Sequence, residues 1–146
     1  MSQMSAIPPK TRSSDYACAL ILGDRQILLG KRSPHRKTYP NKWDVISGKI
    51  ETGESAQAAL TRELAEEIGI APLDATFLTT LADHTLNPED PPRYHFYRVT
   101  EWTGGAPYLA NHEHSELRWF APDAIATLSD LALEDYRPLL ASVLPG

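Results

Sequence analysis

The segment from Ser55 to Ile68 constrains the fold more than any other part of the chain, because its composition is typical of a helix. It contains no glycine or proline, is rich in Ala, Leu, Glu and Gln, and is followed by Gly69, the residue favoured just past a helix end. At about 100° per residue, one side of this helix carries an apolar stripe, formed by Ala56, Ala59, Leu60 and Leu64. We therefore expect an amphipathic helix that packs this stripe against a core.

Three glutamates, Glu63, Glu66 and Glu67, lie on or beside the same stripe by this geometry. Carboxylates three or four residues apart on a helix repel one another, and the helix dipole disfavours negative charge in the last turns. A cluster that faces inward needs protonation or a counter-ion, and oxygen ligands favour a hard cation such as Mg²⁺ or Mn²⁺. The pattern indicates a divalent-metal site, and an ordinary acidic helix paired with Arg62 is the alternative.

The rest of the chain mixes strands and helices without regular βαβ spacing. Apolar runs at 16–22 and 26–30 flank the turn-rich tripeptide Gly23-Asp24-Arg25 and predict a β-hairpin. The segments 31–42 and 47–54 are expected to be loops. Further strands are expected at 43–46, 75–81, 94–100 and 117–120, and further helices at 122–128 and at 133–144, with Pro138 as the weak point of the last. This mixture predicts a compact α/β sandwich with a mixed sheet.

The length and composition of the chain predict one domain. It has 146 residues, of which 42% are hydrophobic, enough for a single core. Residues 1–14 are polar and contain two prolines, so we expect a flexible N-terminal tail followed by one domain at 15–146. The longest apolar run, 16–22, is shorter than the roughly 20 residues of a membrane-spanning helix. With no secretory signal recognisable, we expect a cytoplasmic location and no membrane partner. The only cysteine, Cys18, is expected to be a core thiol.

The charge distribution indicates the kind of ligand. The formal net charge of −5 argues against a nucleic acid polymer as partner, because binding to a phosphate backbone needs clustered Lys and Arg. Basic residues nevertheless gather in the 31–42 loop, directly before the acidic segment. A basic loop beside an acidic helix suits a small ligand that combines a metal ion with phosphates. Two solvated surfaces without a shared purpose are the alternative.

A fixed spacing of glycines and charged residues runs from Gly48 to Ile70. The segment Gly48-Lys-Ile-Glu-Thr-Gly-Glu54 is followed by Ser55 to Thr61 and then by Arg62-Glu63-Leu64-Ala65-Glu66-Glu67-Ile68-Gly69-Ile70. This resembles the Nudix box, G-x5-E-x7-R-E-U-x-E-E-x-G-U with U apolar, and every fixed position is present. The preceding hairpin, the Trp43 strand, Arg118-Trp119-Phe120 and the C-terminal helix also resemble the common Nudix layout. The resemblance implies a Nudix-type α/β/α sandwich with a mixed central sheet and a loop–helix–loop metal site.

The resemblance also implies roles for residues of the box. Glu63, Glu66 and Glu67 would be ligands of Mg²⁺ or Mn²⁺, and the backbone carbonyl of Ser47 would join them. Arg62 would orient a glutamate through a charge-assisted hydrogen bond.

Further candidates surround these ligands. Glu54 would support the loop or the metal shell. The general base would be Glu63 or, from a later loop, Glu113 or Glu116, for which a polar hairpin loop is the alternative. Where many family members have Pro-Gly-Gly, this chain has Ile46-Ser47-Gly48; a glycine required there for a positive φ angle would make the serine alter the loop.

Four residues before the box are candidates for contacts with substrate. Arg32 and Arg36 would hold phosphates, with plain solvent exposure as the alternative. Tyr39 and Trp43 would stack on a nucleobase, with a place in the core as the alternative for an aromatic that begins a strand.

The function implied by the resemblance is metal-dependent hydrolysis of a pyrophosphate linkage in a small-molecule nucleotide or diphosphate. The leading hypothesis is a MutT-like nucleoside triphosphate pyrophosphohydrolase, as a monomer or homodimer, and an ADP-ribose or nucleotide-sugar pyrophosphatase is the closest alternative. Residues 39–43 resemble the segment before the box in isopentenyl diphosphate isomerases, but those enzymes need a catalytic cysteine near the box, and Cys18 lies far upstream. A non-catalytic nucleotide-binding module is the last alternative, although such modules typically lose box glutamates, and all are present here.

Overall fold

The chain folds around one mixed β-sheet. The computed structural model describes residues 7–12 and 14–145. Its elements are β1 (Tyr16–Gly23), β2 (Gln26–Arg32), β3 (Trp43–Asp44), β4 (Ile46–Lys49), α1 (Ala56–Ile68), β5 (Ala71–Pro72), β6 (Thr76–Ala82), β7 (Arg93–Val99), β8 (Trp102–Thr103), β9 (His114–Phe120), α2 (Pro122–Thr127) and α3 (Tyr136–Val143). The sheet runs β3-β2-β1-β7-β6, with β4 paired to β1 and β9 paired to β2. Since β1 and β7 are parallel whereas β2 and β4 are antiparallel to β1, the predicted mixed sheet is confirmed.

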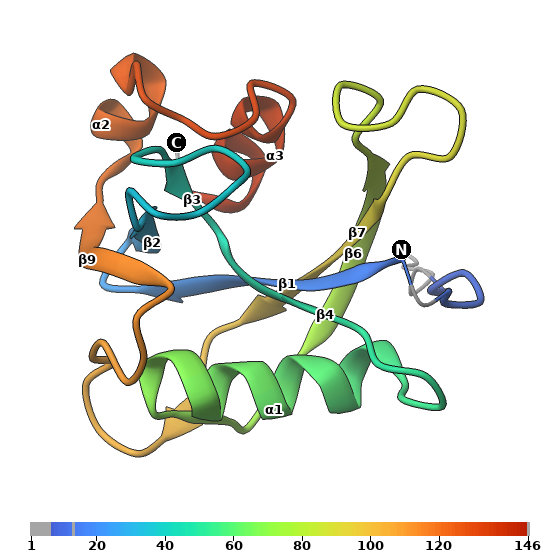
Figure 1. Ribbon diagram of the computed structural model, residues 1–146. Helices are drawn as coiled ribbons and strands as arrows, with labels where there is room; N and C mark the ends of the chain where they lie inside the picture. Colours follow the sequence, from blue (N-terminus) through green and yellow to red (C-terminus); the bar gives the residue numbers. More distant parts are fainter. Residues whose placement is uncertain (1–6, 13, 146) are drawn as a thin grey trace, which may run out of the picture.

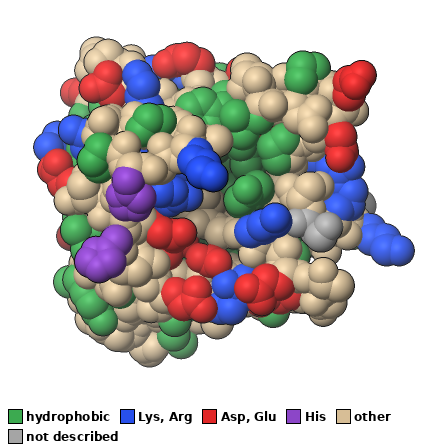
Figure 2. Space-filling view, in the orientation of Figure 1, with side chains coloured by type: hydrophobic (Ala, Val, Ile, Leu, Met, Phe, Trp, Pro, Cys, Tyr) green, Lys and Arg blue, Asp and Glu red, His purple; other side chains and the backbone are tan. Residues whose placement is uncertain are grey.

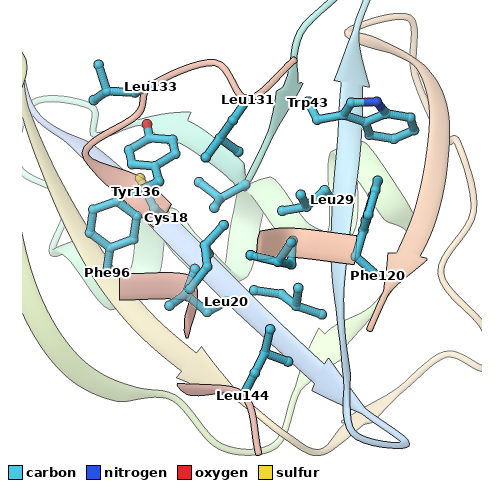
Figure 3. Close-up of a cluster of buried hydrophobic side chains, with 14 of the residues drawn as sticks. Cys18, Leu20, Leu29, Trp43, Phe96, Phe120, Leu131, Leu133, Tyr136 and Leu144 are labelled. Carbon is cyan, nitrogen blue, oxygen red and sulfur yellow. The ribbon is translucent and has the colours of Figure 1, made fainter. Parts of the chain in front are cut away.

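Helices cover both faces of this sheet (Figure 1), as expected for an α/β/α sandwich. Strand β1 is buried on both sides, so its side chains alternate between two cores. Ala17, Ala19 and Ile21 pack with α1. Cys18 and Leu20 pack with residues of α2 and α3, in the cluster that Figure 3 shows. The prediction that Cys18 is a core thiol is confirmed.

Helix α1 has the ends that its sequence predicts. The Ser55 hydroxyl caps its N-terminus by accepting a hydrogen bond from the backbone N–H of Ala58 at 3.1 Å. Gly69 ends the helix with φ 70°, a left-handed conformation that favours glycine. The predicted hairpin between β1 and β2 is also present. Its two loop residues, Asp24 and Arg25, have φ 50° and 65°, as two-residue hairpin loops require.

Several boundaries differ from the predictions. Helix α3 begins at Tyr136 rather than at 133, which puts Pro138 in the first turn, where its missing N–H would have no intrahelical partner. Pro138 is therefore not a weak point. Part of the predicted 47–54 loop belongs to β4, because residues 47–49 pair with β1. The short β5–β8 pair was not predicted.

The described residues before β1 contact the rest of the domain. The predicted tail, 1–14, lies in part outside the described residues, and its described part has no helix or strand. Arg12 forms ion pairs with Asp15 at 3.4 Å and with Asp90 at 3.2 Å, and Arg93 donates to the carbonyl oxygen of Lys10 at 2.7 Å. These contacts tie the described part of the tail to the sheet. Among the described residues, no helix is long and apolar enough to cross a membrane.

Candidate active site

Strand β4 places Gly48, the first residue of the box, against Glu63 of α1. A Cβ atom on Gly48 would lie 1.9 Å from Cδ of Glu63, so glycine alone leaves room for that side chain. Ser47 lies in β4 opposite Cys18 and is not among the residues with positive φ. The serine is therefore compatible with the loop, and the altered conformation considered from the sequence does not occur.

Arg62 of α1 ties the box loop to the helix. Its Nε and Nη2 donate to the two carboxylate oxygens of Glu54, both at 2.8 Å. Its Nη1 donates to Glu63 Oε1 at 2.6 Å, and Nη2 also donates to the carbonyl oxygen of Lys49 at 3.0 Å. Because the guanidinium is planar with fixed donors, these bonds set the orientation of both carboxylates. The hydrogen bonds from Arg62 lower the pKa of Glu54 to about 2, so Glu54 is ionised at neutral pH.

Three carboxylates gather beside this network. Glu63, Glu67 and Glu113 each place one oxygen within 4.8 Å of the others. Glu67 is 1% exposed, and neither of its oxygens has a hydrogen-bond partner within the described chain. Burial raises the pKa of Glu67 far above its ordinary value, and the adjacent Glu63 and Glu113 raise it further. An orphaned buried carboxylate beside two others is a donor set that suits a hard divalent cation, so these residues fit the metal expected from the sequence.

His114, at the start of β9, is buried against the same cluster. Its Nδ1 lies 3.5 Å from Glu67 Oε1, and it too has no hydrogen-bond partner among residues 7–12 and 14–145. Burial lowers the pKa of His114 to about 4, so the imidazole is neutral at neutral pH. A neutral imidazole supplies no positive charge that would favour ionisation of Glu67.

Two predicted carboxylates lie outside the cluster. The Glu66 side chain is 56% exposed and pairs with Arg62 at 3.6 Å, so the inward direction expected for all three helix glutamates is wrong for Glu66. Glu66 lies at the edge of the apolar stripe, so its side chain extends into solvent and not toward the core. Glu116 accepts a hydrogen bond from Arg118 at 2.7 Å, and Arg118 stacks on Trp43, on the sheet face opposite α1. The structure thus brings Glu113, but not Glu116, to the other acids.

A cavity of about 290 Å³ adjoins the acidic cluster. Its lining includes the acids Asp44, Glu63 and Glu113, the basic residues Arg32, Arg36 and Lys49, and an aromatic and apolar group made of Tyr16, Tyr39, Tyr94, Tyr136 and Leu86. Figure 2 shows acidic side chains over α1, with basic and hydrophobic side chains above them around a hollow. Such a lining can hold a ligand that joins phosphates to a flat ring. A larger cavity of about 630 Å³ lies elsewhere, between residues 8–11 and β6, and its lining contains no carboxylate.

The residues predicted to contact substrate have different surroundings. Arg36 and Tyr39 line the cavity, and Arg36 Nη1 lies 3.7 Å from Glu113 Oε1. Arg32 also lines it, but is 8% exposed and bound to Asp44 at 3.1 Å and to the carbonyl oxygen of Thr38 at 2.7 Å. These bonds make Arg32 an anchor of its own loop.

The structure corrects the role predicted for Trp43. It is 5% exposed, its ring lies 5.0 Å from that of Phe120, and it does not line the cavity. Figure 3 shows both rings within the core that α2 and α3 cover. The stacking role predicted for Trp43 is therefore wrong, and its core alternative is confirmed.

Several residues of this site are not predicted from the sequence. His114 follows directly after Glu113, and nothing local in the sequence signals that it is buried beside Glu67. Tyr16 and Tyr94 lie in predicted strands, where alternation gives no sign that both reach one cavity. Lys49 lies inside the box but at a variable position. These residues reach the site only through strand pairing, which brings distant parts of the chain together.

The comparisons with known proteins agree with this fold and site. Residues 12–143 match the family model of the NUDIX domain. The chain therefore belongs to the Nudix family. It is a Nudix hydrolase, an enzyme that acts on acid anhydrides of phosphorus.

Among its relatives, the chain is 34% identical to CTP pyrophosphohydrolase of Escherichia coli (strain K12), over 75% of this chain and 76% of that protein. It is 38% identical to nucleoside triphosphatase NudI of Escherichia coli O139:H28, over 40% of this chain and 41% of that protein. Its backbone resembles the crystal structure of a MutT NUDIX hydrolase from Burkholderia pseudomallei with a TM-score of 0.76 and 28% identity, covering 88% of this chain and 96% of that one.

Proposed function

We propose that the protein is a divalent-metal-dependent nucleoside triphosphate pyrophosphohydrolase with one catalytic domain at 15–146. The observation that carries the proposal is the orphaned, buried carboxylate of Glu67, beside Glu63 and Glu113 and next to a cavity with basic and aromatic walls. Two relatives support the substrate class, since one is named a CTP pyrophosphohydrolase and another a nucleoside triphosphatase.

Glu63 and Glu67 would hold the cation, which we take to be Mg²⁺ or Mn²⁺, and the Nudix box implies Glu66 and the Ser47 carbonyl as further ligands. When bound, the cation supplies a Lewis acid that neutralises charge on the phosphates and makes the attacking water more acidic.

The chain's own residues hold this site in shape. Arg62 fixes Glu54 and Glu63 through three hydrogen bonds and donates a fourth to the Lys49 carbonyl, which orients the acids before substrate arrives. Arg36 and Lys49 line the cavity and would neutralise phosphates that do not react. Together these groups provide the positioning and charge stabilisation on which phosphoryl transfer depends.

Glu113 would accept the proton of the attacking water. It is the one carboxylate of the cluster that lies outside α1, and Arg62 holds Glu63 but not Glu113. We expect Glu113→Gln to lower kcat by roughly 100-fold or more, as removal of a general base does, and Glu116→Gln to change it less than about twofold. The opposite order of effects would transfer the role to Glu116.

The surroundings of Cys18 do not support the isomerase alternative. The thiol is fully buried between the sheet and α3, and burial raises its pKa well above the ordinary value. A buried neutral thiol is inert. The binding-module alternative is disfavoured because every box glutamate is present.

A substrate panel tests the proposal. The purified protein is incubated with Mg²⁺ or Mn²⁺ and with CTP, the other nucleoside triphosphates, ADP-ribose, nucleotide sugars and isopentenyl diphosphate, and the products are separated by chromatography. We expect nucleoside monophosphate and pyrophosphate from a triphosphate. Preferential cleavage of ADP-ribose or a nucleotide sugar would assign the chain to the closest alternative, and isomerisation or binding without turnover would reject hydrolysis.

A further inference from the structure

A buried carboxylate outside the acidic cluster bonds to two of the cavity's tyrosines. Asp83 directly follows β6 and is 1% exposed. Its Oδ2 accepts a hydrogen bond from the Tyr39 hydroxyl at 2.7 Å and one from the Tyr94 hydroxyl at 3.0 Å. Tyr39 comes from the 33–42 loop and Tyr94 from β7, so Asp83 joins three separate parts of the chain.

Asp83 also shapes the loop that leads to β7. Its Oδ1 accepts a hydrogen bond from the backbone N–H of Thr85 at 3.1 Å, and its own N–H donates to the carbonyl oxygen of Pro92 at 2.9 Å. Leu86, which lines the cavity, donates its N–H to the Asp83 carbonyl oxygen at 3.4 Å. These hydrogen bonds hold the loop between β6 and β7 in place around Asp83.

The charge states in this group agree with the hydrogen bonds. Burial opposes ionisation of Asp83, but hydrogen bonds from Thr85, Tyr39 and Tyr94 keep its pKa below the ordinary value. Burial raises the pKa of both tyrosines. Two neutral phenols thus donate to one carboxylate, an arrangement of strong charge-assisted bonds.

The direction of these bonds decides what the cavity offers to a ligand. Each phenol has one proton. Tyr94 donates its proton to Asp83, and the Tyr39 hydroxyl is engaged by Asp83 at 2.7 Å and by the Thr85 hydroxyl at 2.9 Å. Tyr39 and Tyr94 line the cavity beside Leu86, so they present ring surface rather than free hydroxyl donors. Ring surface suits stacking on a planar base.

We propose that Asp83 is a positioning residue that holds Tyr39, Tyr94 and the loop bearing Leu86 as the wall that receives the base of a nucleoside polyphosphate. The inference rests on the proposed function. Tyr39 needs such support because it is one of the non-glycine residues with positive φ, at 49°, a conformation that surrounding contacts must maintain. Asp83 does not line the cavity, so it acts through the tyrosines.

Steady-state kinetics with the best nucleoside triphosphate of the panel test this role. We expect Asp83→Ala to raise KM at least about tenfold with kcat within about threefold, because base contacts made equally in ground and transition states affect binding and not the chemical step. Asp83→Asn retains an acceptor oxygen and should recover part of the affinity. Asp74→Ala is the matched control, because Asp74 accepts hydrogen bonds from Thr100 and Glu101 away from this cavity, and we expect its KM to be unchanged.

A double-mutant comparison separates positioning from general stability. Tyr39→Phe with Tyr94→Phe keeps both rings and removes both bonds to Asp83, so it should raise KM in the wild-type background and add little to Asp83→Ala, as coupled residues do. Additive effects, an unchanged KM for the phenylalanine variant, or a loss confined to kcat would overturn the inference. The phenylalanine variant decides the question even if Asp83→Ala fails to fold. A wild-type protein that cleaves no nucleoside polyphosphate would instead reject the proposed function, and this inference with it.

Discussion

Glu67 stands in an environment that opposes its charge. Its oxygens are buried beside two other carboxylates and without hydrogen-bond donors within the described chain. In Glu67→Gln the side chain keeps its shape and its amide can donate to Glu63 or Glu113. We expect turnover at saturating Mg²⁺ to fall by roughly 100-fold or more, because a metal ligand is lost. The free energy of unfolding without metal should stay equal or rise by about 1 kcal/mol, because the amide adds a hydrogen-bond donor to the cluster. Steady-state kinetics and urea denaturation measure the two quantities, and near-wild-type turnover would remove Glu67 from the metal site.

Asp15 should make the protein sensitive to acid. The carboxylate is buried and accepts from Arg93 at 2.8 Å, with His95 Nε2 also at 2.8 Å. Burial opposes its charge, yet the hydrogen bonds from Arg93 and His95 lower its pKa to about 2. Because the pKa is lower in the folded state than in the unfolded one, the stabilisation is complete above the unfolded value near pH 4 and is lost as pH falls toward 2.

The test of this acid sensitivity is Asp15→Asn. We expect the variant to be less stable than wild type at pH 7 by roughly 2 kcal/mol, because a pKa lowered from 3.8 to about 2 favours the folded state by about that amount. The difference should shrink between pH 4 and pH 2. Denaturant titrations at several pH values give both curves. A difference that stayed constant with pH would mean that Asp15 contributes through packing and not through its charge.

Helix α1 depends on a local cap at its N-terminus. The Ser55 hydroxyl satisfies one of the free N–H groups of its first turn. Ser55→Ala should therefore reduce the free energy of unfolding by about 1 kcal/mol. Ser142→Ala is a suitable control, because that hydroxyl donates to the Leu139 carbonyl within α3 and caps no helix start, so its effect should stay within about 0.5 kcal/mol. Equal effects in thermal or urea unfolding would contradict the capping role.

Metal binding should be linked to the stability of the whole fold. A cation that binds the folded chain, and not the unfolded one, stabilises it by about 2.7 kcal/mol at a concentration of 100 Kd. For a domain of this size, that corresponds to a rise in Tm of very roughly 10 °C. We expect calorimetry to show such a rise for wild type with Mg²⁺ or Mn²⁺, and a much smaller one for Glu67→Gln. NaCl of equal ionic strength is the control, and an equal rise with NaCl would show screening rather than site binding.

The features of this protein that depend on neighbours along the chain could be predicted from its sequence. The limits of α1, its cap at Ser55 and its end at Gly69 follow from short-range hydrogen bonds and from the conformations glycine allows. The β1–β2 hairpin follows from two apolar runs around a turn. The Nudix box likewise lies in one continuous segment, so its spacing revealed the family before any tertiary contact was known.

Which side chains meet in the site could not be predicted from the sequence, because distant segments are brought together only in the folded chain. Glu113 and His114 reach Glu67 because β9 pairs with β2, and the register of that pair shifts between Lys31 and Arg32, which changes the direction in which later side chains point. Trp43 belongs to the core because β3 lies under the loop before α3 and beside Phe120. Asp83 meets Tyr39 across a distance of 44 residues in sequence. Such contacts depend on strand register and on the paths of loops, and neither is encoded in local periodicity.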